Sequence, residues 1–208
     1  KFGALTIPNT VTLIGNNAFA NCNGLTSVTV PGSVKTIGQY AFSGCTSLKT
    51  AVIKTGVESI GVRTFSDCTA LENLTLPYAG LKDNCIDSEN AISTYLFNQY
   101  VPKGTYSAGR PGGSSGYGIP ETLTSITITG GKIIPKNAFY GMKSLKTINI
   151  PNTITNIGDY AFYGCTLMET GVLPSKLTSV GNDAFNGCNF AKFGALTIPN
   201  TVTLIGNN

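Results

Sequence analysis

Residues 25–31 read Leu-Thr-Ser-Val-Thr-Val-Pro, and they are followed by Val34, Ile37-Gly38, Ala41-Phe42 and Cys45. The same order of residue types returns every 23 residues, apart from one interruption. Six phenylalanines mark this period: Phe19, Phe42, Phe65, Phe139, Phe162 and Phe185. A unit of this length cannot bury a core of its own, so the period predicts a solenoid in which successive units stack.

The local chemistry of each unit predicts how its coil is built. Segments such as Leu25–Val30 alternate apolar residues with Ser or Thr, which favours a strand with one apolar side. A proline, such as Pro31, lacks the backbone N–H and ends the strand. The glycine of Ile37-Gly38 is expected to allow a positive φ, and Ala41-Phe42 to lie in a short 3₁₀ or irregular turn. We therefore expect a parallel β-sheet on one face and such turns on the other.

Five of the six cysteines occupy one position of the repeat, three residues after the phenylalanine: Cys22, Cys45, Cys68, Cys165 and Cys188. Met142 takes that position in another unit. A position that accepts Cys or Met is an apolar packing position, so we expect a ladder of buried free thiols, although the stacking distance does not exclude a disulfide. Cys85 lies outside the ladder, where we expect it to pack, with a free thiol as the alternative.

The composition argues against several classes of function. The chain has no histidine, so it lacks the usual general base and the usual catalytic zinc ligand, and we expect neither catalysis nor a metal or cofactor site. The formal net charge is +4, and the basic residues are dispersed, which gives no sign of nucleic-acid binding. No apolar stretch approaches the length of a membrane span.

The recurring strings resemble the BspA-like class of leucine-rich repeats. The resemblance rests on the repeat length and on the proline, Ile-Gly, Ala-Phe and Cys positions, which recur in phase across the chain outside the interruption. It implies a right-handed leucine-rich-repeat solenoid from a cell-surface or secreted protein that binds host or matrix proteins. The interruption is similar to one seen in such proteins, with Pro77-Tyr78-Ala79-Gly80, Tyr95-Leu96-Phe97 and Thr129-Gly130-Gly131 as its markers.

The chain is predicted to be a single repeat domain over residues 1–208, with an insertion at about 81–121. A short helix is expected within residues 90–100, with Phe97 packing as a repeat phenylalanine would. Residues 103–118 are rich in Gly, Ser and Tyr and are expected to form an exposed loop, which is where binding residues often lie. Four residues of the insertion are candidates for partner contact: Tyr100, Tyr106, Arg110 and Tyr117. The alternative is a loop that only covers the solenoid edge.

The outer face of the predicted sheet is a second candidate surface. Strand residues that point outward are mostly small and carry hydroxyl groups, and the candidates for partner contact are Thr29, Thr75, Thr127 and Thr147. Long solenoid faces serve as extended protein-binding surfaces. The alternative explanation is that threonine simply suits an exposed strand.

Residues 1–17 are identical to residues 192–208, whereas other repeats agree only at core positions. This identity favours a recent duplication, or a segment of a longer array of near-identical blocks. It also raises the possibility that the ends of the solenoid stack on other chains, because coil ends without polar caps expose apolar surface.

Two classes of function stay open. The first is a non-enzymatic adhesion module, extracellular or at the cell surface, that binds a protein ligand through the sheet face and the inserted loop. The second is a structural spacer or stalk that displays other modules. An intracellular assembly scaffold is a third possibility.

Overall fold

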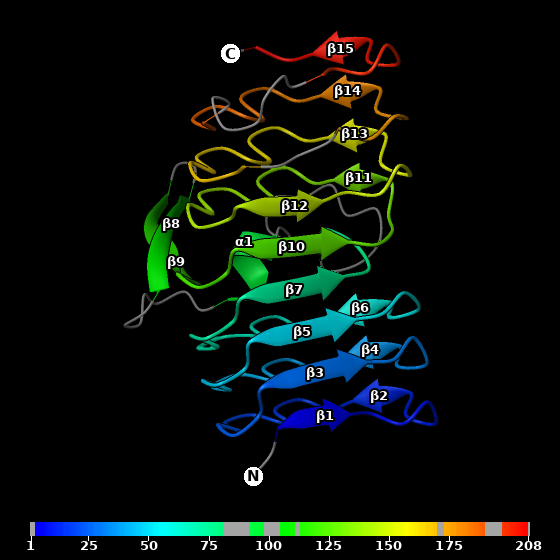
Figure 1. Cartoon of the computed structure of the whole chain (residues 1–208), viewed down its shortest axis with the longest axis vertical. Helices are drawn as coiled ribbons and strands as arrows, with labels where there is room; N and C mark the ends of the chain where they lie inside the picture. The colour runs from blue at the N-terminus through cyan, green and yellow to red at the C-terminus, as the bar shows by residue number, and fades with distance from the viewer. Residues whose placement is uncertain are drawn as a thin grey trace.

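The computed structural model describes residues 3–80, 92–97, 105–110, 113–169, 173–189 and 197–207. These residues build a parallel β-solenoid whose coils stack along the long axis, with the N-terminal and C-terminal coils at opposite ends (Figure 1). The solenoid predicted from the 23-residue period is therefore confirmed.

The main sheet holds one strand from each of six coils, all parallel. In spatial order these strands are β1 (Ala4–Thr6), β3 (Ser27–Val30), β5 (Thr50–Ile53), β7 (Asn73–Leu76), β10 (Ser125–Ile128) and β12 (Thr147–Asn149). Val28 and Val30 point into the core, while Ser27 and Thr29 face outward, as the alternation predicts.

A second set of parallel strands, only two residues each, runs along the next side of the coils. It forms two sheets, β2 (Leu13–Ile14), β4 (Thr36–Ile37) and β6 (Ser59–Ile60), and then β11 (Ile133–Ile134), β13 (Asn156–Ile157), β14 (Ser179–Val180) and β15 (Leu204–Ile205). The break between β6 and β11 falls at the insertion, whereas the main sheet crosses it without a gap because β7 pairs directly with β10.

The core is one continuous cluster that runs the length of the solenoid. Its phenylalanines stack from coil to coil, with ring centroids 5.3 Å apart for Phe19 and Phe42 and 5.1 Å apart for Phe162 and Phe185. Stacked aromatic pairs add about 0.5–1.5 kcal/mol each beyond the burial of their area. The repeat phenylalanine is therefore the main packing unit between coils.

The glycine of each Ile-Gly pair has a different role from the one predicted. Gly38, Gly61 and Gly158 are not among the residues with positive φ. Instead, a Cβ at Gly38 would lie 2.5 Å from the backbone nitrogen of Asn16 in the preceding coil. The prediction was wrong because a glycine can permit either an unusual φ or a close approach, and here the coils approach too closely for a side chain.

Positive φ occurs at two other positions of the repeat, two residues before and two residues after the phenylalanine. The first includes bulky residues, such as Tyr40 (φ 56°), Arg63 (φ 58°) and Tyr160 (φ 56°). The second holds glycine in four coils, as at Gly44, and Asn21 or Asp67 in the other two. These left-handed residues wind the chain tightly around the phenylalanine.

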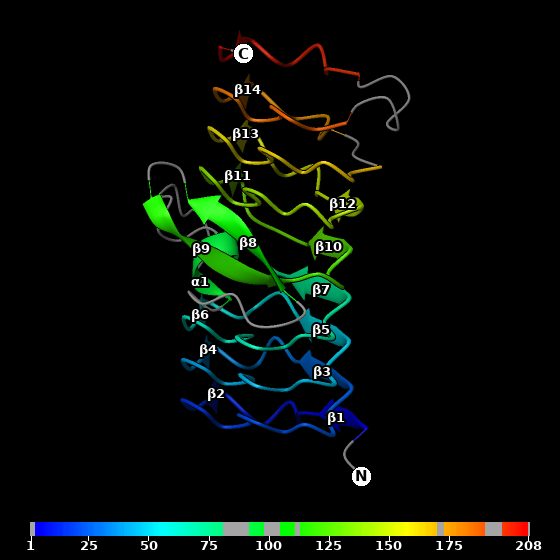
Figure 2. The same cartoon turned by 90° about the vertical axis from the view of Figure 1, so that its left-hand side faces the viewer.

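The described part of the insertion adds a four-residue helix, α1 (Ile92–Tyr95), and an antiparallel hairpin, β8 (Thr105–Arg110) and β9 (Gly113–Pro120). The helix lies within the predicted range. Residues 103–118 were expected to be a loop, and that expectation was wrong for the residues that form the hairpin. The hairpin projects from the flank where the main-sheet strands begin (Figures 1 and 2).

Candidate functional site

The outer face of the main sheet presents two straight rows of side chains, because the strands pair in register. One row runs through Ser27, Thr50, Asn73, Ser125 and Thr147. The other runs through Thr6, Thr29, Val52, Thr75, Thr127 and Asn149. Of the predicted residues, Thr29, Thr75 and Thr127 therefore share one row and Thr147 stands in the other.

This hydroxyl face, as we call the two rows, contains no charged residue. On the side where the strands begin, Lys49 and Glu72 form an ion pair of 3.0 Å that is exposed to solvent. Within the face, Asn149 Nδ2 donates to Thr127 Oγ1 at 3.2 Å. Short hydroxyl side chains can donate and accept hydrogen bonds while letting another polypeptide approach closely.

The hydroxyl face stays continuous where the insertion leaves and rejoins the repeat. Thr75 of β7 is paired with Thr127 of β10. The returning chain is held by Thr122, whose Oγ1 donates to the carbonyl oxygens of Leu71 at 2.8 Å and Thr69 at 3.0 Å. With six strands about 4.8 Å apart, the face is about 24 Å long.

The predicted residues of the insertion lie apart from this face. Tyr106 and Arg110 belong to β8 and Tyr117 to β9, while Tyr100 lies outside the described residues. Figure 2 shows the hairpin crossing the flank of the solenoid, with the main sheet at the edge of that view. The structure thus divides the predicted partner-binding residues between two surfaces that face different directions.

The cysteines form a ladder along the core, in which Cys45, Cys68 and Cys165 are buried and Cys22 and Cys188 are half-buried. Cys22, Cys45, Cys68, Cys165 and Cys188 are all free thiols, and the Sγ of Cys45 donates to the carbonyl oxygen of Phe19 at 3.2 Å. Cys68, Cys165 and Cys188 make the same bond to the phenylalanine of the coil before. Burial raises the pKa of Cys45 and of Cys188 to about 11, so these thiols stay protonated at neutral pH and have little nucleophilic character. Cys85 lies outside the described residues.

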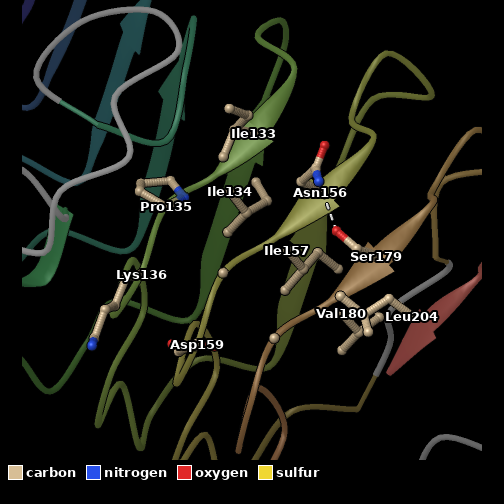
Figure 3. Close-up of a pocket in the computed structure, with 12 residues that line it drawn as sticks. Ile133, Ile134, Pro135, Lys136, Asn156, Ile157, Asp159, Ser179, Val180 and Leu204 are labelled. Carbon is tan, nitrogen blue, oxygen red and sulfur yellow. Dashed lines mark hydrogen bonds between the residues drawn. The ribbon is translucent and has the colours of Figure 1, made fainter. Parts of the chain in front are cut away.

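A shallow groove of about 330 Å³ follows the second set of strands, and the sequence analysis did not identify it (Figure 3). Gly158 and Gly181 line it at the positions where successive coils approach each other too closely for a side chain. Along one rim, Asn156 Nδ2 donates to Ser179 Oγ at 2.6 Å, between the apolar side chains of Ile133 and Leu204. The Ile-Gly spacing could have located this groove, had the glycines been recognised as positions of close approach.

A hollow of about 410 Å³ lies where the insertion departs. Pro77 and Tyr78 line it from the end of β7, and Gly130 and Gly131 line it from the segment after β10. Lys35 also lines it, already paired with Glu58 at 3.0 Å. The structure therefore brings together two of the sequence strings that mark the interruption.

Half-buried tyrosines form a third feature that the sequence analysis missed. Tyr140 and Tyr163, each directly after a repeat phenylalanine, stack with ring centroids 4.9 Å apart, and Tyr160 packs against Tyr163 at 5.9 Å. Burial, and then the neighbouring tyrosines, raise the pKa of Tyr140. The 23-residue spacing of Tyr140 and Tyr163 was the available signal.

Among the described residues, no group of three or more His, Cys, Asp and Glu side chains could hold a metal ion. In the same part of the chain, no helix has the length and apolar character needed to cross a bilayer.

A model of the BspA type leucine rich repeat region, in six copies, matches residues 1–103 and 119–208. Among solved structures, a leucine rich cell surface protein from Faecalibacterium prausnitzii A2-165 is 24% identical with a TM-score of 0.50, over 95% of this chain and 47% of that one. The leucine rich repeat protein of T. pallidum is 22% identical with a TM-score of 0.46, over 98% of this chain and 72% of that one. The chain thus spans about half of the F. prausnitzii protein. No curated protein matches it.

Proposed function

Since the chain belongs to the BspA-type leucine-rich repeat family, we propose that it is a non-enzymatic protein-binding module of a cell-surface or secreted adhesin. The solved F. prausnitzii protein is described as a cell surface protein, which supports this location. The absence of histidine from the sequence and the raised pKa of the buried thiols support a role in binding rather than catalysis.

The observation that carries the proposal is the continuity of the hydroxyl face across the insertion. Thr75 and Thr127 remain paired although the chain makes a long excursion between them. The uncharged outer face therefore runs on past the point where the insertion leaves the sheet. Two rows of mostly small hydroxyl residues, the longer about 24 Å, suit a partner that lies along the solenoid axis.

The test places charge in the middle of the face. In the variant Thr75→Lys/Thr127→Lys, two ammonium groups stand at adjacent positions of one row. The control Thr153→Lys/Thr166→Lys adds the same charge at exposed positions outside the strands. Binding is measured by interferometry on immobilised fibronectin, laminin, fibrinogen and collagen, and circular dichroism verifies the fold of each variant.

We expect the native chain to bind at least one of these proteins, and the sheet variant to lose at least about tenfold in affinity, which corresponds to about 1.4 kcal/mol. The control should bind as the native chain does. A third variant, Tyr106→Ser/Arg110→Ser/Tyr117→Ser, tests the hairpin. If that variant alone loses binding, the binding surface is the hairpin and not the sheet. If the native chain binds none of the proteins, the spacer function is favoured.

A further inference from the structure

Tyr140 and Tyr163 form a stacked pair that the repeat itself does not require. Each follows a repeat phenylalanine directly, and the two rings lie with centroids 4.9 Å apart and planes 4° from parallel. The same position of the other four coils holds Ala20, Ser43, Ser66 and Asn186. Since small or polar residues satisfy the position there, a coil can be built without a tyrosine at this point. The pair is therefore particular to the two coils that follow the insertion.

The backbone holds the two rings at the stacking distance. On one side of the pair, Phe139 N donates to Ala161 O at 2.7 Å. On the other side, Gly141 N donates to Tyr163 O, also at 2.7 Å. The two tyrosines are thus fixed in register by the coils that carry them, and a reaction between their rings needs no search for the partner.

The pair is open to reagents in solution. Tyr140 and Tyr163 are both half-buried, so part of each residue is in contact with solvent. Burial, and then the neighbouring tyrosines, raise the pKa of Tyr140, so at neutral pH it is a phenol and not a phenolate. An oxidant that attacks this side chain therefore removes an electron and a proton together.

The stacking geometry suits one reaction of oxidised phenols. Removal of an electron and a proton gives a phenoxyl radical, whose unpaired electron is shared by the oxygen and the ortho and para carbons. The orbital that holds this electron is perpendicular to the ring plane. In a parallel stack the orbitals of the two rings point at each other, which is the alignment that a new carbon–carbon bond needs. Tyr160 also contacts Tyr163, but its ring is tilted by 57° and lacks this alignment.

We propose that Tyr140 and Tyr163 are an oxidative cross-linking site, at which a haem peroxidase acting with hydrogen peroxide joins the two rings as dityrosine. Each tyrosine loses one electron and one proton, and the two radicals couple through a carbon ortho to each hydroxyl group. The hydrogen on each coupled carbon then moves as a proton to the phenolic oxygen, which restores both aromatic rings. The two electrons and two protons that are removed reduce one hydrogen peroxide to two molecules of water.

The cross-link would tie two neighbouring coils together. Tyr140 lies between β11 and β12, and Tyr163 follows β13, so the new bond closes a loop over residues 140–163. A covalent bond that closes a loop restricts the unfolded chain and so stabilises the folded one. The hydroxyl face consists of strand residues and is not modified. An oxidising environment would therefore strengthen the coil stack without changing the candidate binding surface.

The test treats the native chain, at low protein concentration, with a haem peroxidase and equimolar hydrogen peroxide. A parallel reaction with N-acetyltyrosine verifies that the oxidant is active. Monomer is isolated by size exclusion, and dityrosine fluorescence and the loss of two hydrogen atoms from the intact mass are measured. Trypsin then separates the tyrosines, because Tyr140 lies in peptide 137–143 and Tyr163 lies in peptide 147–176 together with Tyr160. A bond from Tyr140 joins these two peptides, whereas a bond between Tyr160 and Tyr163 stays within one.

We expect the joined peptides from the native chain and from the control Tyr160→Phe. Tyr140→Phe and Tyr163→Phe keep the aromatic stack but lack a hydroxyl group, and each should give at least about tenfold less of the joined product. The treated native chain should unfold at a higher urea concentration than the untreated one, and treatment should leave the urea midpoint of Tyr163→Phe unchanged.

The proposal is overturned if N-acetyltyrosine is oxidised while the native monomer gives no joined peptides. It is also overturned if the joined peptides occur only in covalent dimers, or if Tyr163→Phe gives them in the native yield. Loss of the product in Tyr160→Phe but not in Tyr163→Phe would assign the bond to Tyr160 and would equally overturn it.

Discussion

The backbone amide of Phe65 donates a hydrogen bond of 3.0 Å to the carbonyl oxygen of Leu96, which belongs to the inserted segment. In the regular coils the corresponding bonds are Phe19 to Ala41, Phe42 to Thr64, Phe139 to Ala161 and Phe162 to Ala184. Leu96-Phe97 therefore occupies the Ala-Phe position of the interrupted coil. This part of the insertion therefore packs as a regular coil does, before the chain returns to the main sheet.

Phe97→Ala should destabilise the chain as much as a repeat phenylalanine would, because Phe97 is fully buried in the shared core. We expect a loss of about 3–5 kcal/mol in the free energy of unfolding. Urea unfolding followed by circular dichroism measures it, with Phe65→Ala as the matched comparison. A loss below about 1 kcal/mol would show that the insertion packs independently of the core.

Gly158→Ala should destabilise the chain, because the added Cβ would lie 2.6 Å from the backbone nitrogen of Lys136. Neither group can move without shifting a coil, so the loss should exceed about 1 kcal/mol, as for other overpacked sites. Gly15→Ala is the control. Gly15 holds the same position of the repeat, but a Cβ there would meet no heavy atom within 4 Å. Equal stability of the two variants would contradict the close approach of the coils.

Gly164 provides a test of the left-handed position. Its φ is 71°, and a Cβ there would find only the Cα of Gly141 at 3.8 Å, an ordinary contact. Gly164→Ala should therefore lose about 1–2 kcal/mol through backbone strain alone. Gly164→Asn should lose less, because Asn21 adopts φ 60° at the equivalent position. Thermal unfolding ranks the three proteins, and an Asn variant less stable than the Ala variant would refute this explanation.

The thiol ladder makes stability depend on pH in the alkaline range. The pKa of Cys45 and of Cys188 rises from about 9 to about 11 in the folded chain, chiefly through burial. The folded state holds these protons more tightly, so their contribution is complete below pH 9 and is lost as the pH rises through 11.

The urea midpoint should therefore fall between pH 9 and pH 11. The fall should be smaller in Cys45→Ala/Cys188→Ala, which lacks two of the titrating groups and has its own midpoint at pH 7 as reference. A variant with the same alkaline fall as the native chain would show that other groups cause it.

The coils, the core and the position of Phe97 could be predicted, because the buried residues of stacked coils recur at a fixed spacing in the sequence, and a substitution at one position does not remove that pattern. The role of Gly38 could not, since the absence of a side chain serves either an unusual φ or a close contact, and only the neighbouring coil decides between them. Tyr40, Arg63 and Tyr160 give no local signal of their left-handed backbone, because the stack imposes it on them.

The candidate site was predictable in part for a similar reason. Strand alternation assigns Thr29 and Thr127 to the outer face, and register then aligns them. The hairpin was missed because Gly and Ser in residues 103–118 weaken the strand signal. The antiparallel pairing of β8 with β9 depends on how the two segments pair with each other, which the sequence of either one does not show. The orientation of the hairpin relative to the sheet depends on the whole coil stack.

The direction of the hydrogen bonds between coils has a mechanical consequence. Tension between residues 3 and 207 acts along the solenoid axis, and the ladder bonds between successive coils run in that same direction (Figure 1). The coils therefore bear the load in series and open one at a time at low force, each releasing about 70 Å of chain. Under tension the chain therefore lengthens in steps, one coil at a time, and the coils that remain folded keep their outer face.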